Sequence, residues 1–211
     1  MANSTRASDR QRGEPLEAVC SGPSLPTDSR VVELVRRGQA EAFGVLVRRY
    51  ERQLQRMLYG LVHDREAARD LAQETFLRAF ERLEQFDASR RFGPWLFRIG
   101  LNQAIDWLRH NRRAPRVVAA DGDGRTLDVQ TPDPQLRREL AQEVHRVLAQ
   151  LPIAYRTVLV LRDLQGFSCS EVAAIEGRRE STIRWRLAVA REMFRRLWER
   201  RQGEQNDSRQ R

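Results

Sequence analysis

The chain contains no lysine. All 38 of its basic residues are arginines, and against 29 acidic residues they give a formal net charge of +9. Codon bias in a GC-rich genome would explain the missing lysine, but it does not explain the net positive excess. A positive excess of this size favours a polyanionic partner, and we expect that partner to be nucleic acid.

Metal ligands and long apolar runs are also scarce. Cys20 and Cys169 lie far apart, and His63, His110 and His145 are scattered singly, so no metal site or disulfide framework is indicated. The polar N-terminus lacks the apolar segment of a signal peptide, and nowhere do about 18 apolar residues follow one another. We therefore expect a soluble, cytoplasmic protein without a membrane span, metal or cofactor.

Catalysis would need a convergent set of titratable residues. The best candidates, Asp121, Asp123 and Asp128, lie in a glycine-rich stretch with no partner at metal-ligand spacing. The sequence therefore predicts a protein that is not an enzyme.

Composition divides the chain into two helical blocks with polar flanks. Residues 1–28 are rich in Ser, Arg, Pro and Gly and predict a disordered tail. Residues 114–134 carry DGDG and TPDP and predict a flexible linker, and residues 201–211 predict a polar tail. The blocks between them, 29–113 and 135–200, are both basic. The predicted fold is all-α, with two small helical domains joined by the linker.

Helical periodicity is clearest in the first block, where apolar residues recur at three-and-four spacing over residues 39–62. Asp64 is expected to cap the next helix, which ends before a loop at residues 84–92. Pro94 suits the first turn of a further helix that reaches His110.

The second block contains two short helical signals around a glycine. Ser168 and Glu171 match a capping box at the head of a helix over residues 170–176, and Gly177 suits its end. A second helix is expected from about Ser181. Its apolar face comprises Ile183, Leu187, Ala190, Phe194 and Leu197, and its opposite face comprises Ser181, Arg184, Trp185, Ala188 and Arg195.

An outward Trp185 among arginines on the second of two such helices is typical of a helix-turn-helix that enters the DNA major groove. An ordinary helical hairpin, with a solvated basic face and a tryptophan folded onto a neighbour, would give the same pattern. The arginines gathered around the second helix favour the DNA-binding interpretation.

The second block resembles region 4 of bacterial RNA polymerase sigma factors in residues 151–191, LPIAYRTVLVLRDLQGFSCSEVAAIEGRRESTIRWRLAVAR. The first block resembles region 2 in residues 64–86, DREAARDLAQETFLRAFERLEQF, and residues 92–113, FGPWLFRIGLNQAIDWLRHNRR. Region 2 joined to region 4 by a short linker is the layout of the extracytoplasmic-function class. The resemblance implies a transcription initiation factor whose partners are the RNA polymerase core and promoter DNA, both duplex and opened strand. An anti-sigma factor is a common further partner in this class.

The resemblance also assigns residues to three contacts. For the polymerase core they are Asp70, Leu71, Gln73, Glu74, Phe76 and Leu77. For the minus-ten element, through a pocket that takes up a flipped base, they are Phe86, Arg90, Arg91, Phe92, Trp95, Arg98, Asn102, Arg109, Arg112 and Arg113. For the minus-thirty-five element they are Arg178, Arg179, Ser181, Thr182, Arg184, Trp185, Arg186 and Arg191.

Each assignment has a simpler alternative. The face around Asp70 could be a solvated surface with ion pairs at i, i+4, and Trp95 could be a wall of the core or a wedge against the strand. The family usually has apolar residues on both sides of the turn glycine, where this chain has Glu176 and Arg178, so a less well anchored turn is expected. In the family a basic residue often follows the leucine of the recognition helix, whereas this chain has Ala188 and Val189 there.

The sequence is compatible with two other functions. A helix-turn-helix regulator that acts without polymerase would explain residues 135–200 but would leave the first block without a role. A helical adaptor with merely solvated basic faces would need no DNA at all.

Overall fold

The computed structural model describes residues 26–111 and 133–209. Within these ranges the chain is helical, without a strand, which confirms the predicted all-α fold. The predicted N-terminal tail up to residue 25, the linker up to residue 132, and with them Arg112 and Arg113, lie outside the described residues. The elements in chain order are α1 (Asp28–Arg36), the 3-10 turn η2 (Ala40–Ala42), α2 (Phe43–Val62), α3 (Arg65–Glu81), the 3-10 turn η3 (Leu83–Gln85), α4 (Phe92–His110), α5 (Pro134–Gln150), α6 (Ile153–Leu159), the π-helical segment η6 (Val160–Leu164), α7 (Cys169–Glu176) and α8 (Glu180–Arg209).

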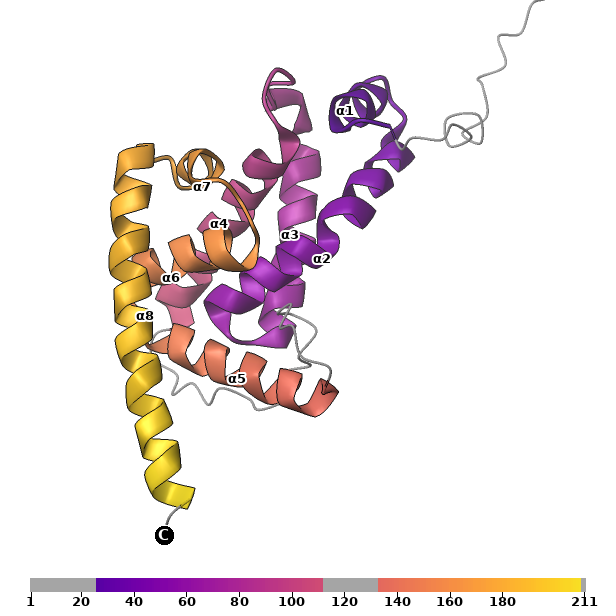
Figure 1. Ribbon diagram of the computed structural model, residues 1–211. Coiled ribbons are helices and arrows are strands. Elements are labelled where there is room, and N and C mark those ends of the chain that lie inside the picture. Colours follow the sequence, from indigo (N-terminus) through magenta and orange to yellow (C-terminus); the bar gives the residue numbers. More distant parts are fainter. Residues whose placement is uncertain (1–25, 112–132, 210–211) are drawn as a thin grey trace, which may run out of the picture.

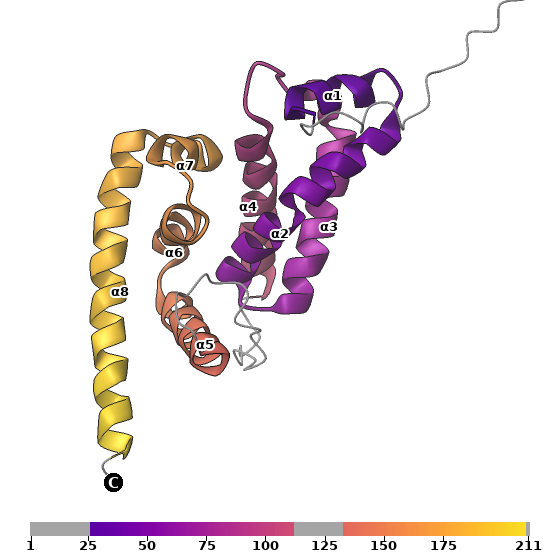
Figure 2. The ribbon, with the colours of Figure 1, turned by 45° about the vertical axis from the view of Figure 1, so that its right-hand side comes forward.

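The elements form two blocks that lie side by side (Figures 1 and 2). Helices α1 to α4 make up the first block, in indigo to magenta, and α5 to α8 make up the second, in orange to yellow. Helix α8 runs along the outer side of the second block, while α7 lies next to α4 of the first. None of the helices in the described ranges is both long and apolar enough to cross a membrane.

Helices α2 and α3 are joined by a turn of only two residues. His63 adopts a left-handed conformation with φ 56° and ends α2. Asp64 then caps α3, because its side chain accepts a hydrogen bond from the backbone N–H of Ala67 at 3.0 Å. The predicted cap at Asp64 is confirmed, and so is Pro94 in the first turn of a helix that ends at His110.

Helix α8 extends further than the sequence indicated. It continues to Arg209, so the polar tail expected from residue 201 is helical over most of its length. The guanidinium of Arg201 binds the carboxylate of Glu143 on α5, which also accepts from Arg146 at 2.9 Å. This ion pair fastens α8 to α5 at the point where the polar tail was expected to begin.

The two blocks share one continuous apolar core. Gly60 on α2 faces Val160 on η6 so closely that a Cβ atom at position 60 would lie 3.1 Å from both Val160 methyl groups. Phe97 on α4 packs edge-on against Phe167 at a ring-centroid distance of 4.8 Å. The sequence predicted two blocks and a connection between them, and it gave no sign of this interface.

Candidate interfaces for nucleic acid and polymerase

The helix-turn-helix is built by local capping interactions. Ser168 Oγ accepts from the backbone N–H of Glu171 at 3.2 Å, and the Glu171 carboxylate accepts from the backbone N–H of Ser168 at 2.9 Å, which confirms the predicted capping box. That backbone hydrogen bond is the main reason why the pKa of Glu171 lies below its usual value. Gly177 ends α7 at φ 65°, a left-handed conformation that favours glycine.

Helix α8 presents two distinct faces at its beginning. Ile183, Leu187 and Ala190 are buried, as the apolar stripe predicted. Arg184 and Trp185 point to solvent, and Trp185 is 60% exposed. The tryptophan therefore does not fold back onto a neighbour. A large exposed aromatic ring among guanidinium groups is the feature that the DNA-binding interpretation requires.

The arginines assigned to upstream DNA fall into two groups. Arg178, Arg179, Arg184 and Arg191 are exposed, although Arg184 pairs with Glu180 at 2.6 Å and Arg191 with Asp163 at 2.7 Å. Pairs this exposed contribute only about 0.2–1 kcal/mol, so phosphates can replace the carboxylates. Ser181 and Thr182 complete this surface at the first turn of α8.

Arg186 differs from the other predicted arginines, because it is engaged inside the protein. Its side chain is only 20% exposed, and it donates to the Glu176 carboxylate at 2.8 Å. Burial raises the pKa of Glu176, and Arg186 opposes that effect. Breaking a pair that is mostly buried is costly, and this cost opposes transfer of Arg186 to a phosphate. This pair anchors the turn around Gly177, in place of the apolar residues that the family usually has there.

The loop after η3 combines a structured turn with a buried aromatic cluster. Asp87 accepts hydrogen bonds from the hydroxyl and the backbone N–H of Ser89, which hold the pKa of Asp87 below its usual value. Phe86 and Phe92 are inside the core, with ring centroids 5.6 Å apart, and Trp95 packs half-buried on both. Phe86 and Phe92 therefore form the floor of this site. Neither ring is an open stacking face, and Phe92 is part of the core, the alternative that its place in a small domain had left open.

Polar residues of the predicted minus-ten set surround that floor. Arg90, Arg98 and Asn102 are exposed, the last two one and two turns along α4 from Trp95. Arg109 lies further along the same helix, exposed, at 3.4 Å from Asp106. Arg91 forms an ion pair with Glu171 of the other block. With these blocks in contact, that pair neutralises one of the cations that the opened strand would need.

The predicted polymerase-binding residues line up along α3. Asp70 and Gln73 are exposed, Leu71 is half-buried, and Glu74 pairs with Arg78 at 2.7 Å. Phe76 is buried, whereas Leu77 is 60% exposed. The assignment therefore combines two surface acids with an apolar side chain that is open to solvent, as a protein interface does.

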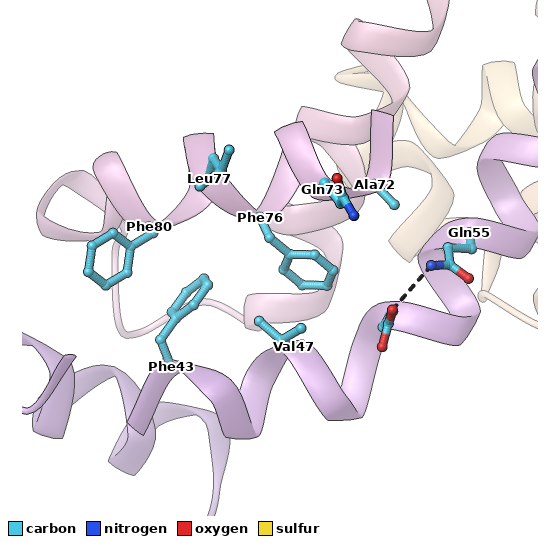
Figure 3. A pocket seen from close by; sticks show the side chains of 9 residues that line it. Phe43, Val47, Gln55, Ala72, Gln73, Phe76, Leu77 and Phe80 are labelled. Carbon is cyan, nitrogen blue, oxygen red and sulfur yellow. Dashed lines mark hydrogen bonds between the residues drawn. The ribbon is translucent and has the colours of Figure 1, made fainter. Parts of the chain in front are cut away.

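An apolar groove between α2 and α3 adjoins this face (Figure 3). It has a volume of about 510 Å³, and Phe43 and Val47 of α2 face Phe76 and Phe80 of α3 across it, with Leu77 at its edge. Sequence reasoning missed Phe80, which is 42% exposed, and both α2 residues. Phe76, Leu77 and Phe80 lie within five positions of α3, which is more than one buried stripe needs. This excess in the sequence could have indicated an exposed apolar surface.

Two family models match this chain in the order that the blocks follow. Sigma-70 region 2 matches residues 46–114, and Sigma-70 region 4 matches residues 141–194. The chain belongs to the sigma-70 family. Region 2 accounts for the first block. A helix-turn-helix regulator that acts without polymerase would leave that block without a role, so this alternative is not favoured.

Relatives place this sigma factor in the extracytoplasmic-function class. It is 36% identical over 174 residues to the RNA polymerase sigma-H factor of Pseudomonas aeruginosa, which covers 78% of this chain and 90% of that protein. It is 33% identical over 175 residues to the ECF RNA polymerase sigma-E factor of Escherichia coli, covering 79% and 91%. The solved structure of CnrH in complex with the cytosolic domain of CnrY superposes with a TM-score of 0.64 at 28% identity, covering 82% of this chain and 97% of CnrH.

Proposed function

We propose that this sigma factor directs the RNA polymerase core to promoters through three separate surfaces. The groove and acidic face of α3 bind the core, the loop at residues 87–91 with the start of α4 captures the opened minus-ten strand, and the first turns of α8 hold the upstream duplex. The chain supplies no catalysis, because the polymerase performs the chemistry. It acts in the cytoplasm, where the polymerase and the promoters are.

The exposed apolar groove is the observation that carries the core-binding proposal. Leu77 and Phe80 are both exposed and adjoin one apolar groove, and an exposed patch of this kind marks an interaction site. The acids next to it, Asp70 and Glu74, would repel phosphates. A protein partner with an apolar ridge and basic flanks fits this surface, and DNA does not.

A titration of fluorescently labelled core polymerase tests this assignment. Leu77→Asp should weaken core binding at least tenfold, since full burial of a leucine contributes about 1.5–3 kcal/mol. Charge reversal at Asp70 and Glu74 together should weaken it too. Leu136→Asp is the matched control, because Leu136 is 45% exposed on α5, away from the groove. Wild-type affinity in Leu77→Asp would exclude the groove from core binding.

Strand capture is supported by the surface above the aromatic floor. Arg90, Arg98 and Asn102 offer exposed cationic and polar groups, and half-buried Trp95 offers part of a ring. This interleaving suits single-stranded DNA, where flipping a base costs a few kcal/mol that the protein must offset. The pair between Arg91 and Glu171 is exposed on the arginine side, so nucleic acid can displace it at small cost.

Permanganate footprinting of promoter thymines with reconstituted holoenzyme tests strand capture. Arg90→Ala and Asn102→Ala should reduce opening on duplex promoters, and an artificial bubble at the minus-ten position should partly restore it because the unstacking cost is gone. Arg52→Ala, an exposed arginine on α2, is the control. Equal opening by wild type, Arg90→Ala and Asn102→Ala would remove the loop and this face of α4 from the mechanism.

Regulation by an anti-sigma factor is a further proposal that rests on the relatives. CnrH was solved in complex with the cytosolic domain of CnrY, and the sigma factor RpoE of Bartonella quintana in complex with the anti-sigma factor NepR. We propose that this sigma factor also has a partner protein that masks its surfaces. Such a partner should compete with core polymerase in the titration described above.

A further inference from the structure

Helix α1 lies outside both segments that match the sigma-70 regions, which begin at residues 46 and 141. It nevertheless makes defined contacts with the rest of the first block. It packs beside the start of α2 and against η3, the turn that leads into the loop at residues 87–91 (Figure 1). Arg36 of α1 contacts one end of that loop directly, and Asp28 of α1 supports the other end through Tyr50 of α2.

Arg36, the last residue of α1, holds the beginning of the loop. Its Nη2 atom donates to the carbonyl oxygen of Leu83 at 2.7 Å, to that of Glu84 at 3.2 Å, and to that of Phe86. These backbone acceptors lie in and just after η3, and that of Leu83 also accepts from the backbone N–H of Phe86 at 3.1 Å. The Arg36 side chain is 26% exposed, so water competes weakly for these bonds. One guanidinium thereby fixes where the loop leaves the helix.

Asp28, the first residue of α1, supports the other end through Tyr50 of α2. The Tyr50 hydroxyl and the Arg49 guanidinium both donate to the Asp28 carboxylate. Burial, followed by the hydrogen bond to Asp28, raises the pKa of Tyr50, so its hydroxyl remains a donor at any physiological pH. The Tyr50 ring packs on Phe92, the first residue of α4, at a centroid distance of 5.7 Å.

We propose that α1 positions the strand-capturing loop, with Arg36 as the positioning residue. The loop carries its own turn between Asp87 and Ser89, but the direction in which it leaves the core is set by Arg36 at one end and by Tyr50 under Phe92 at the other. This inference rests on the proposed role of the loop in strand capture. A displaced loop would still leave the groove and α8 unchanged.

The experiment compares Arg36→Gln with Arg37→Gln in reconstituted holoenzyme. Arg37 is the matched control, because it is adjacent, 67% exposed, and pairs only weakly with Glu33. Arg36→Gln should reduce permanganate-detected opening on duplex promoters roughly tenfold, the equivalent of losing one charge-assisted hydrogen bond. A pre-opened minus-ten bubble should restore most of this loss, and core affinity and upstream duplex binding should stay unchanged. Tyr50→Phe, which keeps the ring and loses the bond to Asp28, should show a smaller defect of the same kind.

The outcomes separate this inference from the proposal that it rests on. If Arg90→Ala impairs opening and Arg36→Gln does not, α1 has no positioning role and the loop keeps its proposed function. If neither impairs opening, both fail together. If Arg36→Gln loses core binding in the same proportion as opening, the variant has a general structural defect and the inference is overturned. The exception is a Tyr50→Phe protein that retains core binding and still opens promoters poorly, which would support the inference.

Discussion

Arg156 donates a hydrogen bond from Nη1 to the carbonyl oxygen of Leu61 over 2.6 Å, from α6 of one block to the end of α2 of the other. Its Nη2 atom donates to the carbonyl oxygens of Ala149 and Leu151 at 2.7 and 3.0 Å. The residue is only 8% exposed. One buried guanidinium thus serves the carboxyl ends of two helices, where backbone carbonyls lack partners and the helix dipole favours a cation.

Arg156→Met should lower the free energy of unfolding by about 3 kcal/mol, because it leaves three buried carbonyl groups without this donor. Urea denaturation followed by circular dichroism measures the change. Arg162→Met is the control, since half-buried Arg162 donates to one carbonyl, that of Phe167, at 3.1 Å, and should cost about 1 kcal/mol or less. Equal costs for both variants would show that Arg156 is not a central connection between the blocks.

Gly60→Val should separate the two blocks. Its side chain would collide with Val160, which already lies 3.1 Å from the position of a Cβ atom, and overpacking of this kind costs about 1–3 kcal/mol. With a protease site inserted after residue 125, the cleaved wild-type halves should co-elute in gel filtration and the cleaved Gly60→Val halves should not.

Two further variants control this experiment. Adding Val160→Ala to Gly60→Val should restore co-elution, because it removes the two colliding methyl groups. Gly44→Val lies on the same helix, where a Cβ atom meets only the Arg48 guanidinium at 3.4 Å, and it should leave the halves together. Separation of the wild-type halves would mean that the interface needs the intact chain.

Arg184→Ala and Trp185→Ala should impair binding to the upstream duplex. An arginine that reads base edges should lose about 1–3 kcal/mol of discrimination between promoter variants, whereas one that contacts only phosphates should lower affinity evenly and reduce the salt slope by about one unit. Fluorescence anisotropy with labelled duplexes distinguishes the two. Arg196→Ala is the matched control, because Arg196 pairs with Glu192 on the same helix as Arg184 pairs with Glu180. A loss in Arg196→Ala equal to that in Arg184→Ala would count against a specific face.

Acid should weaken the protein through His145 on α5. Burial, with a smaller contribution from Arg65, lowers the pKa of His145 from 6.5 to about 4. The unfolded chain therefore takes up a proton below pH 6.5 while the folded chain does not, and stability is lost as the pH falls from 6.5 to about 4, by about 3 kcal/mol in total. His145 packs on Tyr59 of α2 at 4.6 Å and on His63, which follows α2, at 5.8 Å, so the loss falls on the interface between the blocks.

Urea denaturation at several pH values tests this effect. His145→Gln should flatten the dependence of the unfolding free energy on pH between 6.5 and 4, whatever its effect at pH 7. The exposed His110 gives the control, and His110→Gln should keep the wild-type slope. Parallel curves for His145→Gln and wild type would assign the acid sensitivity to other groups.

Local interactions explain which features could be predicted from the sequence. The capping box of Ser168 and Glu171, the cap at Asp64 and the left-handed Gly177 each depend on residues within four positions. The apolar stripe of α8 depends only on helical spacing. These features leave a direct mark on a single sequence, because the atoms that interact are already near each other along the chain.

The features that were not predicted depend on residues far apart. Arg36 reaches Phe86 across 50 positions and Arg156 reaches Leu61 across 95. An arginine can contact DNA or bind acceptors inside the protein. Its burial in the folded structure decides between the two, as Arg186 illustrates. The exposure of Phe80 also depends on tertiary packing, because α3 carries more apolar residues than the first block covers.

The exposure of Trp185 has an optical consequence. The other three tryptophans, at positions 95, 107 and 198, are half-buried, so a small quencher dissolved in water reaches Trp185 most readily. Acrylamide is suitable because it is neutral, whereas iodide would concentrate around the neighbouring arginines. A duplex that covers α8 should shield the indole, and the emission should then resist quenching. The chain therefore carries its own fluorescent reporter on the surface proposed to hold upstream DNA, without any attached dye.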